Sequence, residues 1–301
     1  MLNVKTSPSA KLRELLQSGT LAVPGAFNAF SARLIEEAGF PAVYMSGAGI
    51  SAGRAMPDTG LLTMTEVAKE ARHISRAVQI PVIADADTGF GDVDQVYRTV
   101  QELESAGVAG IQLEDQTLAK RCGHLPGKHV ISREAMCEKI ASAVRAKQDQ
   151  DLLIIARTDA RAVEGLDRAI ERAKAYSVAG ADAIFPEALE SAEEFQKFVK
   201  GLNDPTMVLM ANMTEWGKTP LLSVDEFSNL GYHIVIFPMM MFRLMARAME
   251  EGLIELRAYG TQKGLMGRMQ TRKQLYEILR YEDYDQPEVP MKEKRKVGAL
   301  W

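Results

Sequence analysis

Short apolar segments alternate with longer amphipathic segments through most of the chain. The short segments are rich in β-branched residues and predict strands. There are eight of them: Leu21–Val23, Ala42–Met45, Pro81–Ala84, Gly110–Leu113, Leu152–Ala156, Ala183–Phe185, Met207–Met210 and His233–Phe237. In the longer segments apolar residues recur every three or four positions, which predicts helices. Examples are Val93–Ser105, Arg133–Ala146, Leu166–Ala179 and Ala192–Leu202.

The alternation of strands and helices predicts an α/β protein built from parallel βαβ units. Eight such units in about 250 residues match the number and size of a TIM-type (β/α)8 barrel. A doubly wound sheet is the alternative, but it does not so naturally contain eight units. Most of the predicted strands are followed at once by polar residues or glycine, such as Asp85 to Asp87, Glu114 to Gln116 and Arg157 to Asp159. A barrel brings these positions together at the face where active sites are built.

The sequence predicts one barrel domain over residues 1–280, including C-terminal helices, followed by a polar tail over 281–301. Gly264–Arg280 is predicted as the last helix. The longest interval between strand ends contains the glycine-bearing segment Lys120–Lys128, which we interpret as a lid over the barrel mouth. The basic run Lys292–Lys296 could be a nucleic-acid arm, although short terminal charge runs are usually only solvated.

Composition narrows the function classes. The 301 residues include 36 Lys and Arg against 40 Asp and Glu, a formal net charge of −4, which does not favour nucleic acid or anionic lipid as a partner. No apolar run approaches the ~18 residues of a membrane span, and the N-terminus lacks a signal-peptide pattern. Two cysteines do not make a disulfide framework. We therefore expect a cytoplasmic enzyme with a small-molecule substrate.

Asp85 and Asp87 are the first candidate site. They lie two residues apart at a strand end, so their side chains point the same way. Paired carboxylates beside glycines suit a hard divalent cation that keeps several waters, which describes Mg²⁺ better than Zn²⁺. Glu114, at the end of the next strand, could support the site through water. The alternative is structural, with one aspartate capping a helix and the pair forming an Asx turn.

The segment Lys120 to His124 (KRCGH) is the second candidate site. Cys122 lies between two cations and a histidine on a glycine-containing loop, so we expect a lowered thiol pKa and a reactive or acid–base role. Cys137 lies within an apolar helical pattern and is interpreted as a packing residue. A zinc site is not expected, because no second Cys/His pair is near to complete four ligands.

Three further segments have two interpretations each. Ser46 to Gly49 (SGAG) could cradle an anion with backbone N–H groups or could be a tight turn. Arg157 ends an otherwise apolar strand and needs a partner, either a substrate carboxylate or a neighbouring Asp or Glu. Phe237–Met241 could fill the core or form the wall of an apolar pocket.

Six motifs occur together and in order along the chain. They are DADTGFG from Asp85, EDQ from Glu114, KRCGH from Lys120, ARTD from Ala156, FPEA from Phe185 and GTQK from Gly260. With these motifs the chain closely resembles the methylisocitrate lyase family, within the isocitrate lyase/phosphoenolpyruvate mutase superfamily. The resemblance runs from about residue 10 to 280, and the KRCGH segment is specific to the lyase branch.

The resemblance implies a Mg²⁺-dependent (β/α)8 barrel, with Mn²⁺ as an expected substitute. It also implies a homotetramer whose subunits exchange a C-terminal helix. The implied reaction is the cleavage of a tricarboxylate, 2-methylisocitrate, to pyruvate and succinate by retro-aldol chemistry, within the methylcitrate cycle of propionate breakdown.

The resemblance also assigns roles to residues of this chain. Asp85 and Asp87 match the metal-binding carboxylates, with Glu114 behind them through water. Ala48 stands where glycine is common and Met213 where isoleucine is usual, changes that a backbone contact would tolerate. The positions that match substrate contacts are Ser46, Gly47, Ala48, Gly123, Arg157, Glu187, Asn212, Met213, Thr214, Arg243 and Arg272.

Retro-aldol cleavage leaves negative charge on both fragments. The metal is expected to stabilise the pyruvate end, and Arg157, His124 and backbone N–H groups the aci-carboxylate of the succinate end. Cys122 is the expected general acid that protonates the succinate carbanion, and Tyr44 is the candidate base for the substrate hydroxyl. Closure of the lid would keep water from the carbanion.

Other members of the superfamily are the alternatives. Isocitrate lyases are longer chains with more polar groups where Phe185 and Phe237–Met239 would flank a methyl group. Enzymes that form or cleave C–P bonds generally lack the Cys-Gly-His lid. A binding protein without activity would be expected to have lost the metal or lid motif, and both are intact.

Overall fold

A computed structural model describes residues 6–118 and 120–284. The chain divides into two compact units, residues 1–254 and 255–301. Most of the predicted polar tail, including the basic run Lys292–Lys296, lies outside the described residues. The predicted end of the barrel domain at residue 280 stays a prediction.

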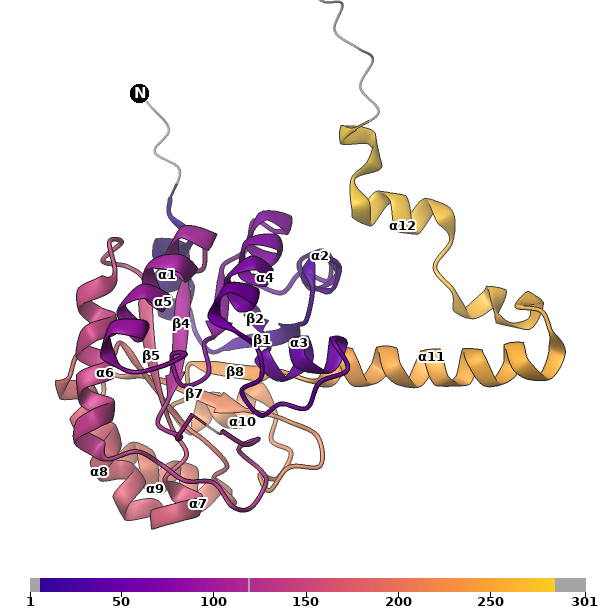
Figure 1. Ribbon diagram of the computed structural model, residues 1–301. Coiled ribbons are helices and arrows are strands. Elements are labelled where there is room, and N and C mark those ends of the chain that lie inside the picture. The colour runs from indigo at the N-terminus through magenta and orange to yellow at the C-terminus, as the bar shows by residue number, and fades with distance from the viewer. Residues whose placement is uncertain (1–5, 119, 285–301) are drawn as a thin grey trace, which may run out of the picture. The chain divides into compact units, whose positions relative to one another are not determined.

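Eight parallel strands close into a barrel in which each strand pairs with the next and β8 pairs with β1 (Figure 1). This confirms the (β/α)8 architecture predicted from the sequence. The strands are β1 (Leu21–Ala26), β2 (Val43–Met45), β3 (Val82–Asp85), β4 (Gly110–Glu114), β5 (Leu153–Thr158), β6 (Ala183–Pro186), β7 (Val208–Asn212) and β8 (Ile234–Phe237).

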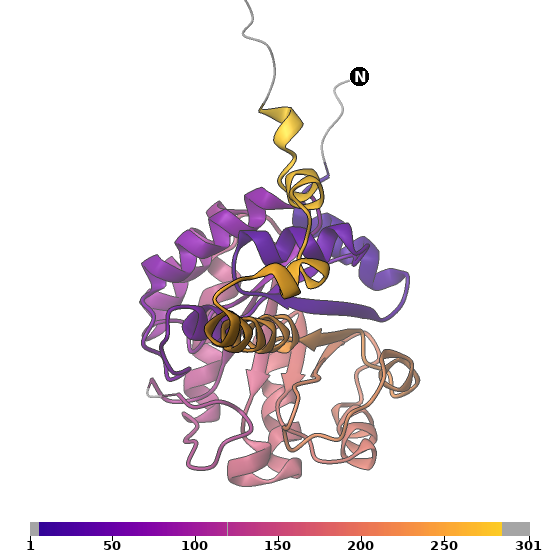
Figure 2. The same ribbon diagram turned by 90° about the vertical axis from the view of Figure 1, so that its right-hand side faces the viewer.

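Most helices of the first unit surround the barrel, as the two views in Figures 1 and 2 show, whereas the helix at residues 240–259 buries none of its side chains. In the first unit they begin after capping residues in most cases; Ser132 and Ser191, for example, accept hydrogen bonds from the backbone N–H groups of Ala135 and Glu194. The helices are α1 (Pro8–Gln17), α2 (Ala29–Glu37), α3 (Gly47–Gly53), α4 (Met64–Ala77), α5 (Val93–Ala106), α6 (Arg133–Ala146), α7 (Arg161–Glu164), α8 (Leu166–Val178), α9 (Ala192–Leu202), α10 (Val224–Asn229) and α11 (Met240–Tyr259), which crosses into the second unit.

All eight predicted strands are present, but several extend further toward their carboxyl ends than predicted. Asp85, Glu114 and Asn212 are the last residues of their strands rather than the first residues of loops. Ladder pairing continues this far: Asp85 is in register with Gln112, and Glu114 with Arg157. The backbones of these polar residues are therefore held by the sheet.

Side chains alternate between the inside and the outside of the barrel, with a period of two. In β5, Ile154 and Ala156 pack in the layer under the helices, whereas Leu153 and Ile155 belong to a separate cluster that fills the barrel interior. Continuing this alternation by one step places Arg157 inside the barrel at its carboxyl end. Arg157 thus occupies the last inward-facing position of β5, at the end of the barrel where a site can form.

Helix α1 closes the amino end of the barrel. Leu12 is fully buried and belongs to the interior cluster. The neighbouring Arg13 forms an ion pair of 2.8 Å with Asp182 and donates a 2.8 Å hydrogen bond to the carbonyl of Asp151. These contacts lie before the first residues of β5 and β6, at the opposite end of the barrel from Arg157.

The second unit contains the end of α11, a 3₁₀ helix at Lys263–Arg268, the helix α12 (Arg272–Leu279) and a short 3₁₀ helix at Tyr281–Asp283. The single helix predicted over Gly264–Arg280 is therefore wrong. The break falls at Met269 to Thr271, because Met269 has an extended backbone and Thr271 starts α12 with a capping box to Gln274.

Replacing Leu12 with alanine should lower the free energy of unfolding by ~2–5 kcal/mol, because a cavity would replace a fully buried side chain. Turnover should stay near normal, since the site lies at the other end of the barrel. Val178→Ala is the control: Val178 is 90% exposed, so its loss should change stability by less than about 0.5 kcal/mol. Denaturant titration measures the free energy of unfolding of both variants. Equal effects would contradict the conclusion that Leu12 of α1 closes the amino end of the barrel.

Candidate active site

A cavity lies at the carboxyl ends of the strands, under the segment Lys120–His124. Most of the residues proposed from the sequence line it, which brings the lid, most substrate candidates and the metal candidate Asp85 to one place; Asp87 and Glu114 are not part of the lining. These residues are Tyr44, Ser46, Ala48, Asp85, Cys122, Gly123, His124, Arg157, Glu187, Asn212 and Thr214. Asp58, Lys120, Arg121, Ile236, Pro238 and Met239 complete the lining.

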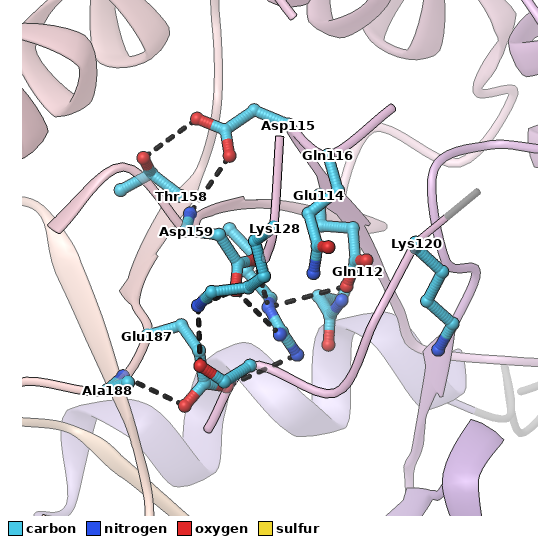
Figure 3. A network of polar contacts seen from close by, with 12 residues as sticks. Gln112, Glu114, Asp115, Gln116, Lys120, Lys128, Thr158, Asp159, Glu187 and Ala188 are labelled. Atoms are coloured by element: carbon cyan, nitrogen blue, oxygen red, sulfur yellow. Dashed lines mark hydrogen bonds and ion pairs between the residues drawn. The ribbon is translucent and has the colours of Figure 1, made fainter. Parts of the chain in front are cut away.

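Arg157 is the centre of the site's electrostatics and is buried among three carboxylates. Figure 3 labels these carboxylates, Glu114, Asp159 and Glu187. The Nε of Arg157 lies 2.9 Å from Asp159 Oδ2 and 3.3 Å from Glu114 Oε2, and its Nη1 lies 3.2 Å from Glu187 Oε2. The guanidinium also lies over the ring of Phe185, at 5.2 Å from the ring centroid. The partners of Arg157 are thus neighbouring carboxylates, one of the two alternatives left open by the sequence.

Glu187 is a permanent anion of the site. Burial opposes its ionisation, but Arg157, together with His124 and Lys128, lowers its pKa to about 2. Asn212 lies beside it, with Nδ2 at 3.3 Å from Oε2, and its own Oδ1 has no hydrogen-bond partner among the described residues. An unpaired buried amide oxygen beside a fixed carboxylate is suited to receiving a donor from a ligand.

His124 makes a hydrogen bond at Nδ1 and a close approach to a carboxylate at Nε2, which has no hydrogen-bond partner among the described residues. Nδ1 accepts a 3.0 Å hydrogen bond from the backbone N–H of Lys218, and Nε2 lies 3.1 Å from Glu187 Oε1. Because Nδ1 is an acceptor, the ring's proton belongs on Nε2, facing Glu187. The lid histidine is therefore fixed in orientation by two loops that are distant in sequence.

Asp85 and Asp87 each place a carboxylate oxygen within 3.5 Å of one point beside Gly47, but Asp87 has a φ of 48° and not the extended backbone from which their common direction was predicted. The backbone N–H of Asp87 donates a 3.1 Å hydrogen bond to Asp85 Oδ1, so the Asx-turn interpretation is also correct in part. The helix that follows is capped by Asp92 and not by either of them. Gly47 adjoins the pair: a Cβ there would lie 2.9 Å from Asp85 Oδ2. The absence of a side chain at Gly47 leaves the carboxylate open on that side.

Gln112 connects this pair to Tyr44. The Tyr44 hydroxyl donates a 2.6 Å hydrogen bond to Gln112 Oε1, and Gln112 Nε2 donates to Asp85 Oδ1 at 3.3 Å. Burial, and then Asp85, raise the pKa of Tyr44 well above its ordinary value, while Arg157 acts in the opposite direction. The phenol is thus held as a proton donor within a continuous buried chain.

Lys120 lies among the acidic residues of the mouth. Its ammonium group is ion-paired with Asp58 and, at 2.6 Å, with Asp87 Oδ1. Burial raises the pKa of Asp87 to about 6, and Lys120 opposes this shift. Burial likewise raises the pKa of Glu114, whose Oε1 has no hydrogen-bond partner in the described part of the chain.

The donor set fits a hard divalent cation. Residues 6–118 and 120–284 contain no preformed group of three or more His, Cys, Asp or Glu side chains that could hold a metal alone. Two adjacent carboxylates with open space beside them, however, are what Mg²⁺ uses when water and substrate complete its shell. The mouth carries six carboxylates against four permanent cations: Asp58, Asp85, Asp87, Glu114, Asp159 and Glu187 against Lys120, Arg121, Lys128 and Arg157.

The expectation of a lowered pKa for Cys122 is wrong. Burial raises the pKa of this thiol, and Glu187 adds to the effect. The neighbouring cations do not compensate, because Lys120 is paired with Asp58 and Asp87, and Arg121 is exposed and faces the carbonyl of Pro126. A thiol that keeps its proton suits a general acid better than a nucleophile.

Other proposed residues have more local roles. Ser46 Oγ accepts a 3.1 Å hydrogen bond from Gly49 N–H and caps α3, which is the turn interpretation of that segment. The N–H of Met213 donates to the carbonyl of Ile236 at 2.8 Å and is therefore in use. Arg243 Nη1 pairs with Glu215 at 2.5 Å. Arg272 lies in the second unit, at the start of α12, and its substrate contact stays a prediction.

Sequence reasoning did not single out four residues that organise the site: Asp58, Gln112, Lys128 and Asp159. Two of them had a usable signal. Gln112 is two positions before Glu114 in the same strand and must share its inward direction. Asp159 is two positions after Arg157. Asp58 and Lys128 lie in loops, where no periodicity indicates direction.

We compared the chain with known proteins. The sequence profile of the phosphoenolpyruvate phosphomutase family matches residues 12–257, so the chain belongs to this family. Two similar relatives carry a more specific name. "Probable 2-methylisocitrate lyase 1" of Corynebacterium glutamicum is 54% identical over 87% of this chain and 86% of the relative. "2-methylisocitrate lyase" of Aeropyrum pernix is 50% identical over 95% and 92%. The family resemblance inferred from the motifs is confirmed.

Solved structures support the same placement. The crystal structure of 2,3-dimethylmalate lyase, a PEP mutase/isocitrate lyase superfamily member, matches with a TM-score of 0.87 and 33% identity over 93% of this chain and 94% of that one. Phosphonopyruvate hydrolase in complex with oxalate and Mg²⁺ matches with a TM-score of 0.84 and 31% identity over 92% and 96%.

Gly123→Ala should abolish most activity, because the added Cβ would lie 2.4 Å from Glu187 Cγ and 2.7 Å from Arg157 Nη2. The lid then cannot seat, and turnover should fall by ~10²-fold or more, as for misplaced catalytic groups elsewhere. Gly53→Ala is the matched control, since its new methyl group would meet nothing closer than 3.9 Å. Steady-state kinetics of both variants measures the difference. Similar turnover rates for the two would contradict the close packing of Gly123 on Glu187 and Arg157.

Proposed function

We propose that the protein cleaves 2-methylisocitrate to pyruvate and succinate. The observation that carries the proposal is the lid segment Cys122–His124 seated on Arg157 and Glu187, in a chain 50–54% identical to two relatives named as 2-methylisocitrate lyases. The seat puts a protonated thiol, a fixed imidazole and a buried cation around one cavity. These are groups that a carbon–carbon cleavage with carbanion protonation requires.

Asp85 and Asp87 are proposed to hold Mg²⁺, with Glu114 behind them. The bound cation would polarise the α-hydroxy-carboxylate end of the substrate, where the alkoxide charge develops when the hydroxyl proton is removed. Its charge would also offset the excess of carboxylates at the mouth before a trianionic substrate enters. The Mg²⁺ in the solved phosphonopyruvate hydrolase complex supports this choice of ion.

Cleavage begins when the hydroxyl proton is removed and the carbon–carbon bond breaks. Tyr44 is the proposed base; Arg157 favours its phenolate, whereas burial and Asp85 raise its pKa and favour the neutral phenol. The electron pair moves to the succinate fragment and spreads into its carboxylate, which Arg157 and His124 face. Cys122 then gives its proton to this carbon.

Pro238 and Met239 line the cavity and are the proposed contacts of the substrate's methyl group. Phe185 does not line the cavity, because its ring lies against Arg157. The methyl contact is worth only ~1–3 kcal/mol, so isocitrate should remain a slow substrate. The similarity to 2,3-dimethylmalate lyase makes 2,3-dimethylmalate a second candidate, which differs in having two carboxylates in place of three.

The purified enzyme should release pyruvate from 2-methylisocitrate faster than from isocitrate or 2,3-dimethylmalate, assayed in parallel. Exhaustive EDTA treatment should abolish the activity, and Mg²⁺ or Mn²⁺ should restore it, because the acidic pair is the proposed metal site. Preference for 2,3-dimethylmalate would contradict the proposed substrate. Full activity after chelation would contradict the metal.

Cys122→Ser should lower turnover by ~10²–10⁴-fold, since serine keeps the shape but is too weak an acid. The Michaelis constant should change little, because the metal and Arg157 would still hold the carboxylates. Cys137→Ser is the control and should leave turnover near normal. Near wild-type turnover in Cys122→Ser would assign proton delivery to water or His124 instead.

A homotetramer with exchanged C-terminal helices is also proposed. Helix α11 has no buried residue, although it is 20 residues long. On the part within the first unit, Leu244, Met249, Leu253 and Ile254 are each 57–69% exposed. Apolar side chains on one helix at this exposure are typical of a surface covered by a neighbour.

Within the described residues no helix is long and apolar enough to cross a membrane. A cytoplasmic location stays part of the proposal.

Light scattering should give about four times the 33.2 kDa mass of one chain. Leu253→Glu together with Ile254→Glu should convert the tetramer to smaller species, because charges would replace the exposed apolar contacts. Arg247→Glu, a change at an already exposed polar position of the same helix, is the control. A stable monomer in the wild type would disprove the assembly.

A further inference from the structure

We propose that Lys128 is a positioning residue that latches the lid by capturing the carbonyl of Gly123. The inference rests on the proposed role of Cys122 and His124 in proton delivery, because Gly123 lies between them. Lys128 itself does not line the cavity, so it is not expected to touch substrate. Its part is to decide where the two neighbouring side chains stand.

Lys128 makes two contacts with its ammonium group. Nζ donates a 2.5 Å hydrogen bond to the carbonyl oxygen of Gly123 and a 2.8 Å hydrogen bond to Asp159 Oδ1. The side chain is only 2% exposed. Charge-assisted hydrogen bonds in so dry a position are stronger than those at a surface, and a carbonyl left there without a donor is unfavourable.

The Asp159 end of the latch is fixed by the barrel. Asp159 is fully buried, its backbone N–H donates 2.9 Å to Asp115 Oδ1, and its carboxylate also holds Arg157. Asp115 is itself held by the hydroxyl groups of Thr158 and Tyr176, each at 2.7 Å. Lys128 is thus anchored to the same frame that positions the central arginine (Figure 3).

The stem of the lid is also fixed, which leaves the tip as the part that can move. Gln116 and Val130 form an antiparallel bridge, and the N–H of Ile131 donates to the carbonyl of Asp115 at 2.8 Å. Lys128 is two residues from Val130 of this bridge, whereas Gly123 is seven residues from each of its two members, at the middle of the loop. A lysine held at the stem therefore reaches across the loop to its tip.

The contact with Gly123 forms only when the tip is seated. Gly123 packs directly on Arg157 and Glu187 with no room for a Cβ, so its carbonyl has one position in the seated lid. We infer that substrate enters and products leave when this carbonyl separates from Lys128, while Lys128 stays on Asp159. The strength of one buried hydrogen bond then biases the closing equilibrium.

The test uses the full-length, metal-loaded enzyme and reads the lid without substrate. Iodoacetamide alkylation of Cys122 is followed by peptide mass spectrometry, with Cys137 in the same molecule as the internal reference. In Lys128→Met, Cys122 should react about 10–100-fold faster in the ligand-free enzyme, the shift expected from one lost buried hydrogen bond, and Cys137 should be unchanged. The ratio kcat/KM for 2-methylisocitrate should fall by a similar factor.

Lys147→Met is the matched control. Lys147 is a half-buried lysine whose side chain is 8% exposed. It also donates to a backbone carbonyl, of Leu152 at 3.1 Å, and pairs with an aspartate, Asp182 at 3.3 Å, but at the amino end of the barrel. Lys147→Met should leave the ratio of the Cys122 and Cys137 alkylation rates unchanged. Lys128→Arg keeps the positive charge and the hydrogen-bond donors, so it should restore part of the protection of Cys122 from alkylation. If Lys128→Met does not fold, Lys128→Arg is the variant used for the test.

Unchanged Cys122 reactivity in Lys128→Met would overturn the latch. So would a parallel acceleration of both cysteines with a lower melting temperature, which would assign Lys128 to general stability. Because alkylation needs no substrate, a protein that fails to cleave 2-methylisocitrate could still show the latch, and the two proposals fail separately.

Discussion

The site depends on one buried cation, Arg157, which is shared by three carboxylates. Glu114, Asp159 and Glu187 come from or directly follow three adjacent strands, β4, β5 and β6, and each lies within 3.3 Å of the guanidinium. Removing such a cation would leave buried charges without compensation, which is far less favourable than losing an exposed ion pair. The arginine therefore fixes the geometry and the protonation of its neighbours together.

From this centre the constraint spreads to the lid. Glu187 receives His124, and Asp159 receives Lys128, which holds Gly123. The lid is thus seated on the charges that position Arg157 and not on an apolar surface. Cys122 lies next to Gly123 in the chain and burial raises the pKa of its thiol, so in the proposed mechanism the seated lid and the protonated thiol belong to one arrangement. This coupling suits a reaction whose carbanion must meet one proton donor and no water.

Much of this could be predicted from the sequence, because barrel strands repeat a simple pattern. Apolar segments located all eight strands, and the polar residues at their ends gathered at one mouth as expected. The predictions failed where an interaction is set by tertiary pairing. The cations beside Cys122 were expected to lower its pKa, but Lys120 faces Asp58 and Asp87 instead. The single helix predicted at Gly264–Arg280 is wrong because a second helix begins after Thr271. The prediction did not recognise Thr271 as the N-cap of that helix.

The most direct test of this account is the protonation of Glu187 with and without Arg157. Isotope-edited infrared spectra of carboxyl groups, with Glu187→Gln difference spectra to assign the band, should show Glu187 ionised in the wild type down to the lowest pH at which it stays folded. This follows from its pKa of about 2. In Arg157→Met the same carboxyl should take up a proton at a clearly higher pH, because burial would then act with less opposition. A Glu187 that remains ionised in the variant over the same range would show that Arg157 does not set the electrostatics of the site.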